Sequence, residues 1–144
     1  MIKTIFFDWF NTLACYNPPR EEIHSLALRE FGIALSPEEI LPGLMLADRS
    51  WFEESARSKI ESRSLEEQSE LRIRYEKTML AQVGIEVSKE TLVKVMARVQ
   101  KLYQVMTFVL FDDVLPTLKM LKQQNYTIGL LTNLAKNMDG ICRK

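Results

Sequence analysis

The chain has 144 residues, of which 47% are hydrophobic and 26% charged, and these ordinary globular proportions exclude a largely disordered chain or a collagen-like rod. Lysine plus arginine and aspartate plus glutamate both number 19, so no global positive field attracts nucleic acid or an anionic membrane. No apolar run approaches the roughly 18 residues of a membrane span, and the N-terminal run has no signal cleavage site. We therefore expect a cytoplasmic protein with no nucleic-acid or membrane partner.

The first expected element is a strand over residues 2–7, a β-branched and aromatic run that carries one charge and ends before Asp8. Such a run is typical of a strand buried on both faces of a parallel sheet. The polar residues 8–12 break it. Residues 16–19 contain two prolines and are expected to form a stiff connector that continues neither helix nor strand.

Residues 20–103 repeat apolar side chains at helical spacing, which predicts four or five helices and no strand. Serine caps are expected to open three of these helices, at Ser36, Ser64 and Ser88. Gly32 and Gly84 are expected to end two of them. The helix after Ser36 meets Pro42 and Gly43, where we expect it to bend or restart before it continues to about Ile60.

The pattern changes after this block. An apolar run at residues 108–111 is followed by Asp112 and Asp113, which precede a helix up to residue 124. Residues 126–132 predict a second buried strand, and residues 134–144 begin another helix. The order strand, helical block, helix, strand predicts an α/β protein whose two parallel strands are joined by a right-handed crossover. We expect a partial α/β core from residues 1–15 and 105–144, and a helical subdomain from residues 16–104.

Polar residues follow both expected strands at their carboxyl ends. Asp8 follows the first strand, and Thr132 and Asn133 follow the second. The ends of adjacent parallel strands converge on one crevice, where open α/β sheets place their ligand sites. A carboxylate there can act as a nucleophile or a metal ligand, and a hydroxyl beside backbone N–H groups can bind an anion.

The sequence segments around these residues resemble motifs of the haloacid dehalogenase (HAD) superfamily. The segment F-F-D-W-F-N-T-L at residues 6–13 resembles its first motif, and I-G-L-L-T-N at residues 128–133 resembles its second. The helical block between them is similar to the cap that one large subfamily inserts after the first motif, and residues 112–122 resemble the helix that leads into the second strand. The resemblance implies an incomplete Rossmann-like parallel-sheet core, termed Rossmannoid, with an all-helical cap domain.

The resemblance also implies a role for each matching residue. Asp8 would attack the substrate to form an aspartyl ester, and its carboxylate would ligate Mg²⁺ together with the backbone carbonyl of Phe10. Thr132 and the amide of Asn133 would bind the oxygens of a small anionic substrate. The implied function is hydrolysis of a phosphate ester or a 2-haloacid.

Two departures from the family pattern keep an alternative open. Phe10 stands where phosphatases of this family carry an aspartate that protonates the leaving alcohol, and a phenyl ring cannot transfer a proton. The third motif, a lysine, and the fourth, an acidic pair, are also missing, so the chain resembles a truncated member. Two apolar strands with open edges suggest completion by a second copy or by a C-terminal segment. The alternative is a non-catalytic, degenerate HAD-like module for binding or oligomerisation.

Other polar residues are expected to be structural. His24, the only histidine, is expected on the surface of its helix, and Asp113 is expected to cap the helix that follows it. The helical arginines, among them Arg20 and Arg57, are expected to be solvated.

Overall fold

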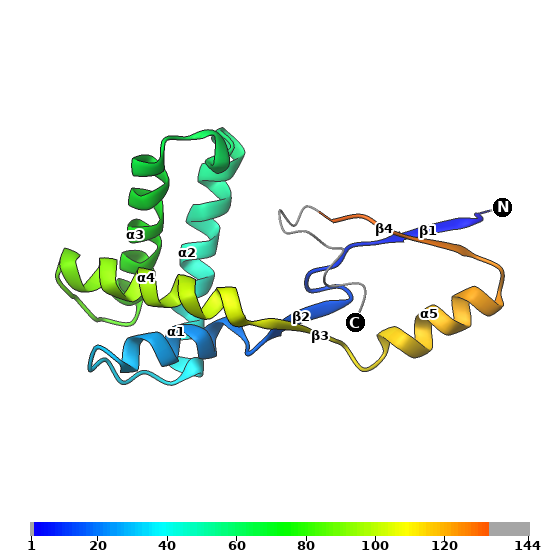
Figure 1. Ribbon diagram of the computed structural model, residues 1–144, viewed down its shortest axis with the longest axis horizontal. Coiled ribbons are helices and arrows are strands. Elements are labelled where there is room, and N and C mark those ends of the chain that lie inside the picture. The colour runs from blue at the N-terminus through cyan, green and yellow to red at the C-terminus, as the bar shows by residue number, and fades with distance from the viewer. Residues whose placement is uncertain (1, 133–144) are drawn as a thin grey trace. The chain divides into compact units, whose positions relative to one another are not determined.

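A computed structural model describes residues 2–132, which divide between two units. One unit is the helical segment Pro18–Val105, and the other contains the described residues on either side of it. The α/β class with an all-helical cap domain, expected from the sequence, is the class observed (Figure 1). Among the described residues, no helix combines the length and apolar composition of a membrane-spanning segment.

Four α-helices and one short 3₁₀ helix make up the helical unit. They are α1 (Arg20–Arg29), α2 (Pro37–Arg57), η1 (Ile60–Ser62), α3 (Leu65–Gln82) and α4 (Lys89–Val105). Their apolar stripes face one another in a core in which Leu28, Leu44 and Met79 have no exposed surface. The helices α2 and α3 lie side by side in Figure 1 and form the most extensive helix pair of this unit.

Serine side chains cap the starts of α2 and α3, as the sequence predicted. Ser36 accepts a hydrogen bond from the backbone N–H of Glu39, whose carboxylate accepts one in return from the backbone N–H of Ser36. Ser64 and Glu67 form the same reciprocal pair at the start of α3. Each pair satisfies two N–H groups that the first helical turn would otherwise leave without a partner.

Two glycines end α1 and α3 in the same way. Gly32 and Gly84 have φ angles of 77° and 75°, in the left-handed region that glycine adopts without steric cost. At the first, the N–H of Ile33 donates to the carbonyl of Leu28 at 3.1 Å. At the second, the N–H of Ile85 donates to Leu80 at 3.0 Å. These six-to-one bonds define Schellman motifs, which stop both helices where the sequence predicted.

Of the expected bend or restart at Pro42 and Gly43, the restart is wrong, because α2 continues through both residues as one helix of 21 residues. Pro42 has no N–H to donate to the carbonyl of Glu38, one turn earlier, so α2 lacks that backbone hydrogen bond. Gly43 promotes helix packing, because its missing side chain lets α2 approach the backbone of Met79 on α3. The helix ends earlier than expected, at Arg57, and Ile60 begins the separate element η1.

His24 is buried, which corrects the expectation of a surface position. Only 2% of its surface is exposed, and its Nδ1 lies 3.3 Å from Oε2 of Glu76, which is 3% exposed. Among the described residues neither atom has a hydrogen-bond partner of good geometry. A pair of polar groups therefore sits inside the apolar core between α1 and α3.

Arg20 is also paired rather than solvated. Its guanidinium donates to both carboxylate oxygens of Asp48, at 2.9 and 2.7 Å, and the Tyr75 hydroxyl donates to the same carboxylate at 2.8 Å. The bond to Asp48 raises the pKa of Arg20, while burial, followed by the charge of Asp48, raises the pKa of Tyr75. The three groups tie α1, α2 and α3 together in a neutral network.

Within the described residues, the second unit contains two small sheets and one helix. Strand β1 (Thr4–Phe7) pairs in parallel with β4 (Thr127–Leu130), and β2 (Ala14–Asn17) pairs antiparallel with β3 (Thr107–Leu110). Helix α5 (Val114–Gln123) precedes β4 and packs against it. The β2 strand corrects the expected connector at residues 16–19, because Tyr16 and Asn17 pair with Phe108 and Thr107.

The parallel strands are less buried than their apolar composition predicted. Phe6 on β1 is 65% exposed, and Leu131 just after β4 is 70% exposed. The cause is the size of the sheet, since β1 and β4 have only each other as hydrogen-bonded neighbours among the described residues. Within residues 2–132, the outer edges of both strands are therefore unpaired, which leaves them able to pair further.

Candidate functional site

The candidate site lies at the carboxyl edge of the β1–β4 sheet. The parallel register joins Phe7 to Leu130, and the backbone N–H of Leu131 donates to the carbonyl of Phe7 at 2.9 Å. Asp8 follows Phe7 directly, and Thr132 follows Leu131. The backbone that carries Asp8 and the backbone that carries Thr132 therefore leave the sheet at the same edge, about one register step apart. Asn133, the other residue expected there, lies outside the described residues, as does the helix expected from residue 134.

A tight backbone turn follows Asp8 and leads into β2. The carbonyl of Trp9 accepts from the backbone N–H groups of Leu13 and Ala14, both at 3.0 Å, and Asn11 donates to Ala14 at 2.8 Å. Asn11 adopts a φ of 59°, which asparagine tolerates better than most residues. Among the described residues, no backbone N–H of this turn donates to the carbonyl oxygen of Phe10. That oxygen can therefore accept a hydrogen bond or ligate a metal ion beside Asp8.

An aromatic cluster borders this turn. The ring centroids of Phe10 and Tyr16 are 4.4 Å apart, and those of Tyr16 and Phe108 are 5.2 Å apart. Trp9 meets Phe108 edge to face at 5.8 Å, and its buried Nε1–H has no hydrogen-bond partner among the described residues. The contact with Tyr16 holds the Phe10 ring against β2, and Tyr16 in turn contacts Phe108 on β3. The position two residues after Asp8 is thus part of an aromatic cluster, and its own side chain carries no proton donor.

The candidate site offers oxygen ligands of the kind that Mg²⁺ prefers, but it offers only a small number of them within the described residues. Asp8 is exposed and offers a carboxylate, and the Phe10 carbonyl offers a second hard oxygen. Within residues 2–132 no group of three or more histidine, cysteine, aspartate or glutamate side chains is placed to hold a metal. Mg²⁺ usually keeps several waters and takes few carboxylates, so two protein oxygens fit part of its octahedral shell.

Sequence reasoning missed how Phe10 is supported. The antiparallel β2–β3 pairing brings Tyr16 and Phe108 together beside the turn, although these residues lie 92 positions apart in the chain. The apolar run at residues 108–111 was the available signal. Asp113 does occupy the cap position of α5, but its side chain makes no capping hydrogen bond there.

Comparison with known proteins assigns the family. A model of the haloacid dehalogenase-like hydrolases matches residues 2–139, nearly the whole chain. Among solved structures, the chain resembles one titled a predicted phosphoglycolate phosphatase from Haemophilus somnus 129PT, with 18% identity and a TM-score of 0.48. That alignment covers 92% of this chain and 52% of the other, so the chain spans about half of that protein's length. A search of curated proteins found no match. On the match of the family model, the chain belongs to the haloacid dehalogenase-like hydrolases.

Proposed function

We propose that the chain carries the nucleophile of a hydrolase that acts on a small anionic substrate through an aspartyl-enzyme intermediate. Asp8 is the proposed nucleophile. The observation that carries the proposal is the parallel register of β1 and β4, which brings the chain segments of Asp8 and Thr132 to one edge of one sheet. The exposure of Asp8 supports the role, because a nucleophile must be open to its substrate.

The proposed chemistry has two displacements. A carboxylate oxygen of Asp8 attacks the substrate and displaces the leaving group with its bonding electron pair, which forms an ester on Asp8. Water then hydrolyses the ester and restores the carboxylate. Thr132, with the Asn133 amide, would bind the anionic oxygens of the substrate. When bound, Mg²⁺ would supply positive charge between two anions that otherwise repel, and Asp8 and the Phe10 carbonyl would hold it.

Phe10 favours substrates whose leaving group departs without a proton. Its ring packs on Tyr16 and cannot donate a proton to a leaving alkoxide. A halide leaves as a stable anion, and so does the conjugate base of an acidic phenol. We therefore propose that 2-haloacids and activated phosphate esters are better substrates than alkyl phosphates. The helical unit Pro18–Val105 is proposed to act as the cap that selects among them.

The second candidate is a non-catalytic module for binding or oligomerisation. The apolar surface on and beside the β1–β4 sheet favours it, since Phe6 and Leu131 are largely exposed and the sheet edges are open. A second copy or a separate C-terminal segment could pair there. Stable self-association without Mg²⁺ binding in a titration would favour this candidate, whereas Mg²⁺-dependent turnover would argue against it.

The test is a substrate panel with an inactive variant. Release of halide from 2-haloacids and of phosphate from aryl and alkyl phosphates is measured for the chain and for Asp8→Asn. We expect turnover that Asp8→Asn abolishes while its circular dichroism spectrum stays unchanged. Equal activity in the variant would remove Asp8 as the nucleophile, and preference for alkyl phosphates would contradict the role given to Phe10.

A further inference from the structure

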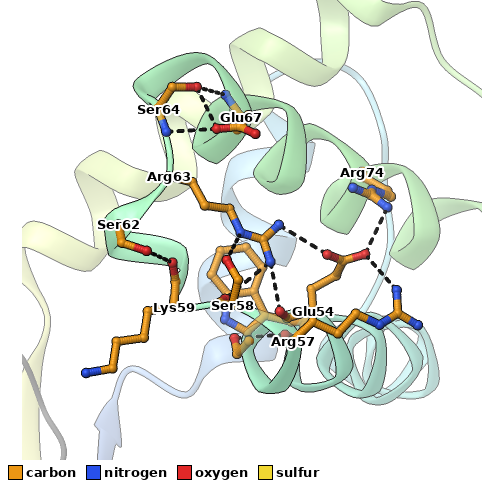
Figure 2. A network of polar contacts seen from close by, with 11 residues as sticks. Glu54, Arg57, Ser58, Lys59, Ser62, Arg63, Ser64, Glu67 and Arg74 are labelled. Atoms are coloured by element: carbon orange, nitrogen blue, oxygen red, sulfur yellow. Dashed lines mark hydrogen bonds and ion pairs between the residues drawn. The ribbon is translucent and has the colours of Figure 1, made fainter.

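A cluster of charged side chains joins the end of α2 to the start of α3, far in sequence from the strand-end site (Figure 2). At its centre is Glu54, which is surrounded by Arg57, Arg63 and Arg74. Its Oε2 accepts from Nη1 of Arg63 at 3.1 Å, and its Oε1 lies 3.4 Å from Arg74 and 3.5 Å from Arg57. One carboxylate therefore faces three guanidinium groups.

Arg63 has a structural role in this cluster. Besides Glu54 Oε2, it donates to the backbone carbonyls of Glu54 and Ser58 and to the Ser58 hydroxyl. These carbonyls belong to the end of α2, which a cationic side chain stabilises. Only 15% of the Arg63 side chain is exposed. Its donors are engaged within the protein, so it is not a free ligand for a small molecule.

Arg57 and Arg74 are different. Their side chains are 73% and 60% exposed, and among the described residues each contacts an acid through one nitrogen only. A guanidinium carries five N–H donors, so both arginines keep capacity for a second anion. The hydrogen bond from Arg63, with the charges of all three arginines, lowers the pKa of Glu54, so the carboxylate is ionised at neutral pH. Hydrogen bonds from Ser64, followed by the charge of Arg63, also lower the pKa of Glu67, so three positive charges against two negative ones leave a local surplus of one.

A cavity of about 180 Å³ adjoins these two arginines. Its lining includes the charged residues Arg57, Arg74 and Glu54, together with Trp51, Leu71 and Thr78. Glu53 also borders it, but Arg49 lies 3.2 Å from that carboxylate and balances its charge. The volume could hold roughly six water molecules, which is the size of a small organic molecule.

The aromatic wall of this cavity is held in place. Trp51 meets Tyr75 edge to face, with ring centroids 6.0 Å apart and an interplanar angle of 89°. Tyr75 is in turn fixed by its hydrogen bond to Asp48. A rigid indole beside exposed guanidinium groups offers an apolar surface and a positive one within the same cavity.

We propose that this α2–α3 cavity is a second ligand site, which binds a small organic dianion such as a phosphate monoester. Arg57 and Arg74 bind the anionic end through the N–H donors that Glu54 leaves unused, and the apolar part of the ligand lies against Trp51. Glu54 and Arg63 keep the site assembled, since their hydrogen bonds hold the end of α2 to the segment before α3. The residues that line this site all belong to the helical unit and do not include the proposed nucleophile Asp8, and binding there needs no catalytic step.

The test uses phenyl phosphate as the probe and the two tryptophan indole N–H signals as reporters. The whole chain is used as the Asp8→Asn variant, so that the probe is not consumed, and a Trp9→Phe version assigns the signals. Trp51 lines the α2–α3 cavity, whereas Trp9 adjoins Asp8, so the two signals distinguish binding at the two sites. Titration is followed by nitrogen–proton correlation spectra, which also report whether each variant is folded.

We expect a saturable shift of the Trp51 signal that phenol, the uncharged analogue, does not reproduce. Arg57→Gln with Arg74→Gln should weaken the binding by about tenfold or more, because it removes both charged hydrogen-bond donors. Arg74→Gln alone should weaken it less, and Arg29→Gln, which changes an exposed arginine of α1 that does not line the cavity, should leave it unchanged. Three results would overturn the proposal: no shift of Trp51, a shift of Trp9 alone, or a Trp51 shift that survives the double substitution.

Discussion

The close approach of α2 to α3 at Gly43 yields a sharp prediction about stability. A Cβ atom at this position would lie 3.1 Å from the carbonyl carbon of Met79 and closer still to its carbonyl oxygen. Both residues are buried, and the clashing atoms are backbone, so a change of rotamer cannot relieve the contact. At a position without this contact, a glycine-to-alanine change such as Gly43→Ala would raise the free energy of unfolding by about 1 kcal/mol, because alanine has the higher helix propensity. Overpacking against a neighbouring backbone costs about 1–3 kcal/mol, and the rigid contact here places the cost at the upper end.

We therefore expect Gly43→Ala to lower the free energy of unfolding by about 1–2 kcal/mol net. Urea unfolding followed by far-UV circular dichroism measures the change. Ala56, exposed on the same helix, provides the control, because Ala56→Gly reports the propensity term alone and should cost about 1 kcal/mol. A Gly43→Ala protein that gains the full propensity term would refute the close packing of α2 on α3.

Two further predictions concern polar groups of the helical unit. His24→Leu removes the imidazole beside the buried carboxyl group of Glu76 and should lower the free energy of unfolding by about 1–3 kcal/mol, whereas adding Glu76→Leu should recover most of the loss. Additive effects in a double-mutant cycle by urea unfolding would contradict the pairing. The hydrogen bond from Arg63 is the chief cause that lowers the pKa of Glu54 below its ordinary 4.5. The ionised Glu54 carboxylate therefore contributes its full stabilisation above pH 4.5. This contribution is lost as the pH falls through the pKa of Glu54 in the folded state. The urea midpoint should fall more steeply below about pH 4.5 in the parent chain than in Glu54→Gln, and parallel curves would be the contrary result.

The sequence predicted best what depends on near neighbours. Ser36 and Ser64 reveal helix starts because their hydrogen-bond partners lie three residues away. Gly32 and Gly84 reveal helix ends because few other residues adopt their backbone conformation without strain. The shared edge of Asp8 and Thr132 was also predictable, because adjacent parallel strands end on the same side.

The errors concern partners that are distant in sequence. Tyr16 pairs across the β2–β3 ladder with Phe108, and no local signal at the prolines that follow β2 reveals that strand. His24 lies on the buried face of α1 beside Ile23 and Leu28, and its partner Glu76 comes from α3. The aromatic support of Phe10 is missed for the same reason, since it depends on strand pairing and not on the motif around Asp8.

The most direct test of the central claim is the fate of solvent oxygen during turnover of a 2-haloacid. The chain is incubated with 2-chloropropionate in water enriched in oxygen-18, and the peptide that contains Asp8 is analysed by mass spectrometry. If water attacks the carbonyl carbon of an aspartyl ester, the heavy oxygen enters the Asp8 carboxylate. The account predicts this label in Asp8. Halide release with the heavy oxygen only in the hydroxyacid product, and none in Asp8, would contradict it.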